Sequence, residues 1–350
     1  AQLLARWADA KDSKLSAADK KVLRDAAKTM ENKSLSAEER LAAVQSSDIE
    51  QLHETNPLRD GLSESNPQRF RVERPKSSFA SWYQFFPRSE GAYYGEDGKI
   101  VPGNLKTSIA GLERAAAEGF NIVYLPPIFP IGVTNRKGRN NSLVAGPNDP
   151  GSPFGIGSEL GGHDTVDPQL GTMDDFKAFC ERAHELGLEI ALAFALQCSP
   201  DHPWVKAHPN WFRTKPDGTI AFAENPPKKY QDIYPIDFNA DMEGIEKEVE
   251  RIMDLWVKAG VTIFRVDNPH TKPVRFWQDV IAAVTKKHPE ILFLAEAFTR
   301  PGMMRALSYV GFTQSHCYFP WRNTKDELEE YLPVTNSDDG YYQDHTYSPT

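Results

Sequence analysis

The sequence has few cysteines and no long apolar run. Its 350 residues include Cys180, Cys198 and Cys317, an odd and widely spaced set without a CxxC motif. Such a set fits a reducing compartment better than a disulfide framework, and it indicates neither thiol nor metal chemistry. No apolar run approaches the roughly 18 residues of a membrane span, and no signal peptide precedes the first predicted helix. We therefore expect a cytoplasmic protein that does not associate with a membrane.

An excess of positive charge is also absent. The 40 lysines and arginines are outnumbered by 49 aspartates and glutamates, which gives a net charge of −9. Nucleic-acid binding needs clustered positive charge to neutralise phosphates, so a nucleic-acid partner is not expected. The glycine-rich GIGSELGG (155–162) lacks the spacing of a dinucleotide fingerprint and lies within a long loop. The sequence therefore does not favour a nucleotide cofactor, and we expect no cofactor.

The composition that is present predicts one large core with a smaller appendage, because 40% of the residues are apolar. Residues 1–54 contain two capping signals, from Ser16 to Asp19 and from Ser36 to Glu39, and each precedes a helical apolar pattern. Residues 55–76 are rich in Asn, Pro, Ser, Gly and Arg. We expect a helical segment, a linker, and a catalytic domain over residues 77–350.

The segment 77–350 alternates short apolar runs with amphipathic helix patterns. Strands are predicted at 82–86, 121–125, 189–196, 261–266, 291–294 and 312–318, and helices at 105–119, 174–186, 245–258, 274–287 and 325–331. This alternation predicts an α/β fold with parallel strands, either a doubly wound sheet or a (β/α)₈ TIM barrel.

Polar residues at the carboxyl ends of successive predicted strands favour the barrel, because barrel active sites are built there. These residues are Gln197, Asp267 and Glu296. Six strands are two fewer than a closed barrel needs. Either this pattern misses strands or the chain stops before the barrel closes, and we expect an incomplete barrel. The long loops at 126–171 and 198–241 are candidates for the functional surface.

Two carboxylates end neighbouring strands, Asp267 in FRVD and Glu296 in FLAE. A strand-helix-strand unit returns the chain to the same rim, so both face one cleft. Retaining glycosidases place two carboxyl groups about 5 Å apart, close to the roughly 4.8 Å between adjacent strands. Arg265 points to the same side as Asp267 and would help to keep it ionised. Apolar surroundings would raise the pKa of Glu296, as a general acid needs.

The residues around this strand end allow a second interpretation. Pro269 predicts that Asn268 is extended and that the chain then turns outward. Asp267 could instead cap the following helix, with Arg265 as a structural ion-pair partner. The position of Glu296 at the equivalent height of the next strand favours catalysis.

FRVDNPH (264–270) and FLAEAF (293–298) resemble the nucleophile and acid/base segments of the α-amylase family, retaining α-glucoside enzymes built on (β/α)₈ barrels. Further strings narrow the resemblance to members that transfer maltose from maltose 1-phosphate to an α-1,4-glucan. They are WYQFFPRSEG (82–91), RKGRNNSL (136–143), GGHDTVDPQLGT (161–172), ALQCSPDHPWV (195–205), ENPPKKYQDIYPIDF (224–238), DNPHTKP (267–273) and AEAFTRP (295–301). The resemblance extends from about residue 79 to residue 331.

The resemblance implies that Asp267 is the nucleophile and Glu296 the acid/base. It implies further that the donor phosphate is held by Asn225, Lys228, Tyr230 and Asn268, and that the sugar is contacted by Lys137 and Gln197. One cation among neutral donors suits a phosphate that is held and then released. The family also implies a role in α-glucan (glycogen) biosynthesis and a homodimer. The alternative is that lysines in a polar loop contact only solvent and bind no phosphate.

Two features depart from the family pattern. Ala193 stands where the family has an aspartate inside the barrel, which would remove a buried partner of Arg265. The family's third catalytic aspartate follows a later strand, and the tyrosine- and aspartate-rich stretch with Asp338, Asp339 and Asp344 does not match it. The resemblance thus implies that the chain stops at or just before this residue. We expect the chain alone to be poorly stable and either weakly active or inactive.

Two other functions share part of this pattern. An α-glucan hydrolase or a trehalose-interconverting relative would use Asp267 and Glu296 but would need no phosphate pocket. A catalytically inactive, truncated glucan-binding fragment is favoured by Ala193 and by the unmatched third aspartate. The intact carboxylate pair and the phosphate-binding segment oppose that second alternative.

Overall fold

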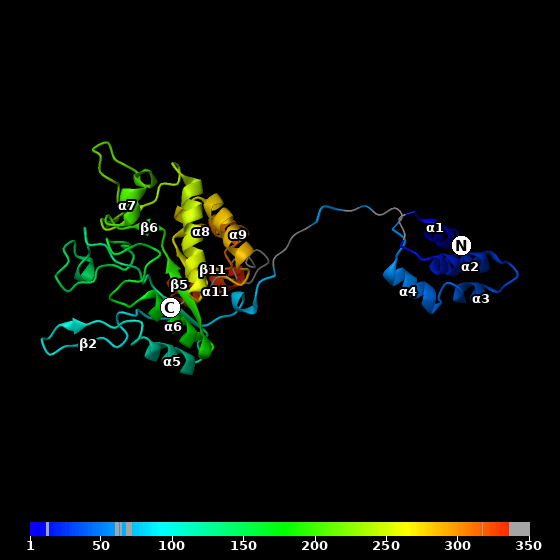
Figure 1. The fold of residues 1–350 in the computed structure, drawn as a ribbon, viewed down its shortest axis with the longest axis horizontal. Helices are drawn as coiled ribbons and strands as arrows, with labels where there is room; N and C mark the ends of the chain where they lie inside the picture. The colour runs from blue at the N-terminus through cyan, green and yellow to red at the C-terminus, as the bar shows by residue number, and fades with distance from the viewer. Residues whose placement is uncertain (12–13, 60–62, 64, 68–71, 317, 336–350) are drawn as a thin grey trace. The chain divides into compact units, whose positions relative to one another are not determined.

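The computed structural model describes residues 1–11, 14–59, 63, 65–67, 72–316 and 318–335 (Figure 1). The chain divides into two compact units, Ala1–Arg71 and Val72–Thr350. Cys317, Asp338, Asp339 and Asp344 lie outside the described residues. Among the described helices, none combines the length and the apolar character that a membrane crossing requires.

The first unit is helical, and its helices are drawn in blue in Figure 1. They are α1 (Gln2–Asp9), α2 (Ala17–Glu31), α3 (Ala37–Ala42) and α4 (Ser47–Thr55). Both predicted capping boxes are present, since Ser16 and Asp19 bond reciprocally before α2, as Ser36 and Glu39 do before α3. The helices enclose a small apolar core that includes Leu4, Trp7, Leu23, Ile49 and Leu52.

The second unit is built on a parallel sheet whose strand order follows the chain. Its strands are β1 (Trp82–Gln84), β4 (Ile122–Leu125), β5 (Glu189–Phe194), β10 (Val261–Asp267), β11 (Leu292–Glu296) and β12 (Gln314–Ser315). Each strand pairs in parallel with the next. A doubly wound sheet would reverse its strand order at a switch point. The uniform progression confirms the predicted TIM-barrel class, of which the described strands form an incomplete barrel.

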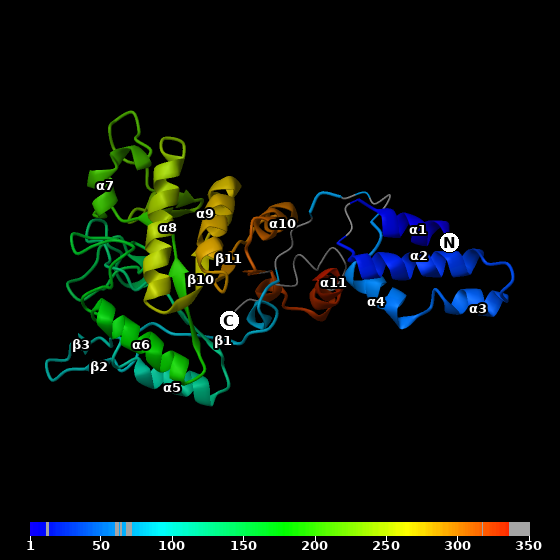
Figure 2. The same cartoon turned by 45° about the vertical axis from the view of Figure 1, so that its right-hand side comes forward.

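Helices follow the strands, and all but the last of them contribute side chains to the large apolar cluster on the outer face of the sheet. They are α5 (Ile109–Ala117), α6 (Met173–Glu185), α8 (Met242–Lys258), α9 (Val274–Lys287), α10 (Pro301–Tyr309) and α11 (Lys325–Thr335). Figure 2 shows α5 beside α6 and α8 beside α9. The sequence pattern did not predict α10, which begins at Pro301 directly after the loop that follows Glu296. Proline is favoured at the first position of a helix because its missing N–H has no intrahelical partner there.

Side chains alternate between the two faces of the sheet, as the strand period of two requires. In β10, Phe264 and Val266 pack into the large cluster beneath the helices, whereas Ile263 joins a second cluster. That second cluster includes Tyr124, Ala193 and Leu294 from neighbouring strands. Arg265 and Asp267 continue the Ile263 face toward the carboxyl end of the strand. The alternation therefore directs both polar side chains into the barrel interior.

The amino end of β5 carries a compact ionic group. Glu189 accepts two hydrogen bonds of 2.9 Å from Arg74, and the Nζ of Lys76 lies 2.8 Å away. Thr262 of β10 donates a further hydrogen bond of 2.8 Å to Glu189. Burial alone would raise the pKa of Glu189, but these partners lower it to about 2. We call these four residues the amino-end cluster.

The loops at the opposite, carboxyl end contain the remaining elements. These are the paired strands β2 (Tyr93–Tyr94) and β3 (Ile100–Val101), β6 (Gln197–Cys198) and β9 (Tyr234–Pro235), and β7 (Ala223–Asn225) and β8 (Lys228–Tyr230), with helix α7 (Pro203–Ala207). The 3-10 helices η2 (Arg139–Asn141), η3 (Pro209–Trp211), η4 (Pro269–Thr271) and η5 (Phe319–Trp321) also follow strands, whereas η1 (Pro75–Ser77) precedes β1 and contains Lys76 of the amino-end cluster. Hydrogen bonds connect the two long loops, 126–171 and 198–241. Asp201 of the second loop accepts them from the backbone N–H groups of Val133 and Thr134 at 2.6 and 2.7 Å.

Candidate active site

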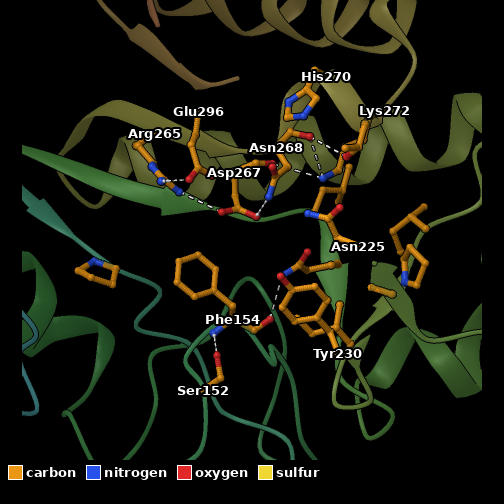
Figure 3. A pocket seen from close by; sticks show the side chains of 18 of the residues that line it. Ser152, Phe154, Asn225, Tyr230, Arg265, Asp267, Asn268, His270, Lys272 and Glu296 are labelled. Atoms are coloured by element: carbon orange, nitrogen blue, oxygen red, sulfur yellow. Dashed lines mark hydrogen bonds and ion pairs between the residues drawn. The ribbon is translucent and has the colours of Figure 1, made fainter. Parts of the chain in front are cut away.

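A cavity of about 790 Å³ opens at the carboxyl end of the sheet (Figure 3). Its lining combines strand ends with residues of both long loops, among them Tyr124, Phe154, Gln197, Tyr230, Asp267 and Glu296. Ligand sites of barrel proteins lie at this end. The loops predicted to form the functional surface therefore supply part of the cavity wall.

Arg265 joins the two carboxylates that the sequence singled out. Its Nη1 lies 3.0 Å from Oδ1 of Asp267, and its Nη2 lies 2.9 Å from Oε1 of Glu296. Asp267 and Glu296 are register partners on the adjacent strands β10 and β11. Figure 3 shows both ion pairs of the Arg265 guanidinium, one to each acid. Arg265 and Asp267 are buried, so the ion pairs lie in a medium where charge interactions are strong.

Ala193 is the register partner of Arg265 on β5 and is fully buried. Alanine at this position predicts that Arg265 lacks a buried acidic partner on β5. In the structure the arginine pairs with the two acids of β10 and β11, and its guanidinium carbon lies 5.6 Å from the ring centre of Tyr124. A cation at this distance from an aromatic face is attracted to it.

The pKa of Glu296 is raised to about 7. Burial is the largest cause, and the negative charge of Asp267 adds to it, while Arg265 opposes both. This is the direction expected from the apolar surroundings in the sequence. A carboxyl group with this pKa exchanges a proton near neutral pH, which suits a general acid and base.

Asn268 adopts a left-handed backbone conformation, with φ 46° and ψ 51°. The expectation that Pro269 makes it extended is therefore wrong. A following proline disfavours the right-handed helical region, and asparagine is one of the few residues that tolerate the left-handed one. The turn brings the Asn268 side-chain nitrogen within 3.2 Å of Oδ2 of Asp267, to which it donates.

The predicted substrate-binding residues divide into two groups. Gln197, Asn225, Tyr230 and Asn268 line the cavity. Lys228 is exposed on β8 and does not line it.

Lys137 is buried away from the same cavity, and its Nζ lies 2.5 Å from Oε1 of Gln231. The structure thus brings the neutral predicted ligands together and leaves the two predicted lysines outside.

Lys272 and His270 line the cavity and were not predicted as site residues. The Nζ of Lys272 lies 3.3 Å from the carbonyl oxygen of Asp267 and 3.2 Å from that of Asn268. Burial lowers the pKa of Lys272 to about 8, against the opposing effect of Asp267 and Glu296. Both residues belong to the DNPHTKP string. The position of a lysine five residues after the predicted nucleophile could have identified Lys272 as a site residue.

His163, Cys198 and His202 place potential metal-ligand atoms within 4.8 Å of one another in the buried interior. Hydrogen bonds already use the imidazole nitrogens: His163 Nδ1 faces His202 Nε2 at 3.0 Å. The other nitrogens bond Ala195 O and the Trp204 N–H. Burial lowers the pKa of both histidines, so both are neutral at pH 7. The arrangement fits a hydrogen-bonded brace beneath Gln197 better than a metal centre.

Known structures with a similar fold include α-amylases. An α-amylase from Lactobacillus plantarum matches with a TM-score of 0.59 and 25% identity, over 75% of this chain and 61% of that one. A maltogenic α-amylase from Thermotoga neapolitana matches with a TM-score of 0.57 and 25% identity, over 78% and 57%. The sheet and the carboxylates at its rim therefore define a TIM-barrel protein of the α-amylase family.

Sequence relatives are more specific. Residues 1–74 match the family described as α-1,4-glucan:maltose-1-phosphate maltosyltransferase, domain N/S. Proteins named α-1,4-glucan:maltose-1-phosphate maltosyltransferase are 83% identical in Bifidobacterium longum and 76% identical in Bifidobacterium animalis subsp. lactis, each over 100% of this chain. Over its full length the chain is therefore similar to proteins of this name. It spans about half the length of these curated relatives, 47% and 48% respectively.

Proposed function

We propose that the chain is the catalytic portion of a retaining maltosyltransferase. It would transfer maltose from maltose 1-phosphate to the non-reducing end of an α-1,4-glucan, in α-glucan (glycogen) biosynthesis. The observation that carries this proposal is the Arg265 bridge to both Asp267 and Glu296 within one cavity. Carboxylates on adjacent strands suit the short separation of a retaining mechanism. The names of the relatives supply the donor and the acceptor.

In the first half-reaction, a carboxylate oxygen of Asp267 attacks the anomeric carbon of the donor. The bond from this carbon to the phosphate oxygen breaks, and its electron pair leaves with the phosphate. The product is a maltosyl ester of Asp267. Phosphate is a good leaving group, so proton donation by Glu296 contributes less to this half. Arg265 would align Asp267 for attack through their ion pair.

In the second half-reaction, the 4-hydroxyl of the glucan attacks the same carbon. Glu296 accepts the hydroxyl proton as a general base, and the ester bond to Asp267 breaks. The near-neutral pKa of Glu296 supports both protonation states within one cycle. Exclusion of water while the acceptor binds would favour transfer over hydrolysis.

Neutral donors in the cavity would bind the substrate. Asn225, Tyr230 and Asn268 would hold the phosphate, and Gln197 would contact the sugar. Hydrogen bonds from uncharged groups hold a phosphate without the full strength of an ion pair, which allows release. The phosphate contact of Lys228 and the sugar contact of Lys137 stay predictions, since neither residue lines the cavity.

We also propose a cytoplasmic location and a homodimeric assembly. The odd cysteine set supports a reducing compartment, and Cys180 and Cys198 are buried free thiols. The homodimer follows from the family resemblance alone. Size-exclusion chromatography with light scattering on the longest natural form of the chain tests it, and a monomer at micromolar concentration would contradict it.

Glucan-dependent release of phosphate from maltose 1-phosphate tests the proposed activity. We expect the longest natural form to release phosphate when maltohexaose is present and to extend the glucan by maltose units. Product analysis separates transfer from hydrolysis, because a hydrolase would release free maltose and leave the glucan unextended. Glucan binding without phosphate release would support an inactive binding fragment instead.

A further inference from the structure

The charged residues of the cavity are unequally matched. Among the described residues, its lining contains three acids, Glu224, Asp267 and Glu296. It also contains the basic residues Arg265 and Lys272. Arg265 is committed to Asp267 and Glu296 through its ion pairs. Glu224 is exposed and faces Lys229 at 3.8 Å. No carboxylate in the described part of the chain forms a direct ion pair with Lys272, although Asp267 and Glu296 act on its charge at longer range.

The contacts of Lys272 leave its charge available. Its ammonium hydrogen bonds go to the carbonyl oxygens of Asp267 and Asn268, at 3.3 and 3.2 Å. Both distances are at the long end for N–H···O bonds, and a carbonyl carries no formal charge to neutralise the ammonium. An ammonium has three protons, so one remains for a ligand. A half-buried ammonium without a direct ion-pair partner is unfavourable, and an anionic ligand in contact with it would relieve part of that cost.

The position of Lys272 fits the leaving group. Figure 3 shows Arg265 and Glu296 on one side of Asp267, with Asn268 and then Lys272 on the other. Asn225, which also lines the cavity, is drawn on this same side of Asp267. The neutral groups proposed to hold the phosphate therefore lie on the Lys272 side of the nucleophile, where Lys228 does not reach the cavity lining.

We propose that Lys272 determines donor specificity by pairing with the phosphate of the glycosyl donor, an inference that rests on the proposed function. The ammonium would stabilise the negative charge that grows on the phosphate as its bond to the sugar breaks. A glycosyl donor with a small leaving group would not use this contact. Lys272 would then separate phosphate donors from other α-maltosyl donors.

The alternative role of Lys272 is to clamp the turn that carries Asp267. Its two carbonyl contacts hold the backbone of Asp267 and Asn268. A clamp would affect every donor equally, because the nucleophile itself would be displaced. A phosphate contact would affect only the phosphate donor. Comparing two donors therefore separates the two roles.

The test uses Lys272→Met and Lys272→Arg in the longest natural form of the chain, with the exposed Lys286→Met on α9 as the control. Steady-state kcat/KM is measured with maltose 1-phosphate and with α-maltosyl fluoride, each with maltohexaose as acceptor. We expect Lys272→Met to lower kcat/KM for the phosphate donor about 10- to 100-fold, the range for loss of a charged hydrogen bond. The fluoride value is expected to change less than about twofold, and Lys272→Arg to recover part of the loss.

Inorganic phosphate provides a second readout, as an inhibitor of fluoride turnover. Its inhibition constant is expected to rise in Lys272→Met and to stay unchanged in Lys286→Met. If Lys272→Met does not fold, Lys272→Arg and Lys272→Gln replace it in the same comparison. Equal losses with both donors, or unchanged phosphate inhibition, would overturn the inference and assign Lys272 to the clamp. Failure of the unaltered protein to use maltose 1-phosphate would overturn the proposed function, and the inference with it.

Discussion

The sheet carries an arginine paired with carboxylate at each of its two ends, and the two groups differ in how charge is balanced. In the amino-end cluster, Arg74 and Lys76 both bind the single carboxylate of Glu189, whose pKa falls to about 2. At the carboxyl end, the single guanidinium of Arg265 is shared by Asp267 and Glu296, and the pKa of Glu296 rises to about 7.

The comparison indicates that the pKa of a carboxylate in these clusters depends more on the ratio of cations to carboxylates than on the residue types. Two cations lower the pKa of Glu189 by more than burial raises it, so Glu189 stays ionised and contributes to the stability of the fold. One cation between two acids leaves Glu296 able to gain and lose a proton. Barrel proteins place stability at the amino end of the strands and chemistry at the carboxyl end, and the two clusters follow that division.

The largest expected effect is the loss of activity in Asp267→Asn. Without the nucleophile, glucan-dependent phosphate release is expected to fall by about 10⁴-fold or more. The exposed Asp279→Asn on α9 serves as the matched control, since it changes the same functional group outside the cavity. Retention of more than about a tenth of the activity in Asp267→Asn would contradict the assignment of the chemistry to Asp267 at the carboxyl end of the sheet.

Glu189→Gln is expected to lower the free energy of unfolding by about 2 kcal/mol, because Arg74 and Lys76 lose a largely buried partner. Urea denaturation at pH 7 measures the change. The control is Glu113→Gln, which removes the exposed ion pair with Arg182 and is expected to cost less than about 0.5 kcal/mol. Activity per folded molecule is expected to stay unchanged in both variants.

The stabilisation by Glu189 has a defined pH dependence. Its folded pKa of about 2 lies below the ordinary value of 4.5, so the stabilisation is fully present above about pH 4.5. It is lost as the pH falls toward 2. The difference in unfolding free energy between the unaltered chain and Glu189→Gln is expected to shrink over this interval. A difference that stays constant between pH 5 and pH 2.5 would contradict the lowered pKa.

Glu296→Gln is expected to have the opposite, smaller effect on stability. The folded pKa of Glu296 lies above its ordinary value of 4.5, so ionisation costs stability increasingly from about pH 4.5 and fully above pH 7. The neutral glutamine removes this cost, and the variant is expected to gain about 1 kcal/mol at pH 8 and almost nothing at pH 5. Thermal melts at the two pH values measure it, and equal gains would argue against the raised pKa.

The arrangement of charged residues at the carboxyl end of the sheet was partly predictable from the sequence. Asp267 and Glu296 end apolar runs on either side of one helix pattern, and the strand period places Arg265 with Asp267. These rules depend on local spacing, and the register of β10 and β11 follows them. The strand series and both capping boxes were predicted for the same reason.

Features set by long-range packing were not predictable. Lys272 lines the cavity because the Asn268 turn and the helix η4 fold it back over the strand end, and the sequence gives only its distance along the chain. Lys137 bonds Gln231 across two loops, a contact between residues far apart in the sequence. Asn268 was predicted as extended because the effect of Pro269 was considered without the tolerance of asparagine for the left-handed region.

Intact-protein mass spectrometry of Glu296→Gln mixed with maltose 1-phosphate tests the central assignment most directly. This variant retains Asp267 but lacks the base that activates the acceptor, so the account predicts a mass increase of one maltosyl group. Peptide mapping would place that group on Asp267, and Asp267→Asn would show no increase under the same conditions. Phosphate release by Glu296→Gln without any covalent maltosyl adduct, or an adduct on another residue, would contradict the account.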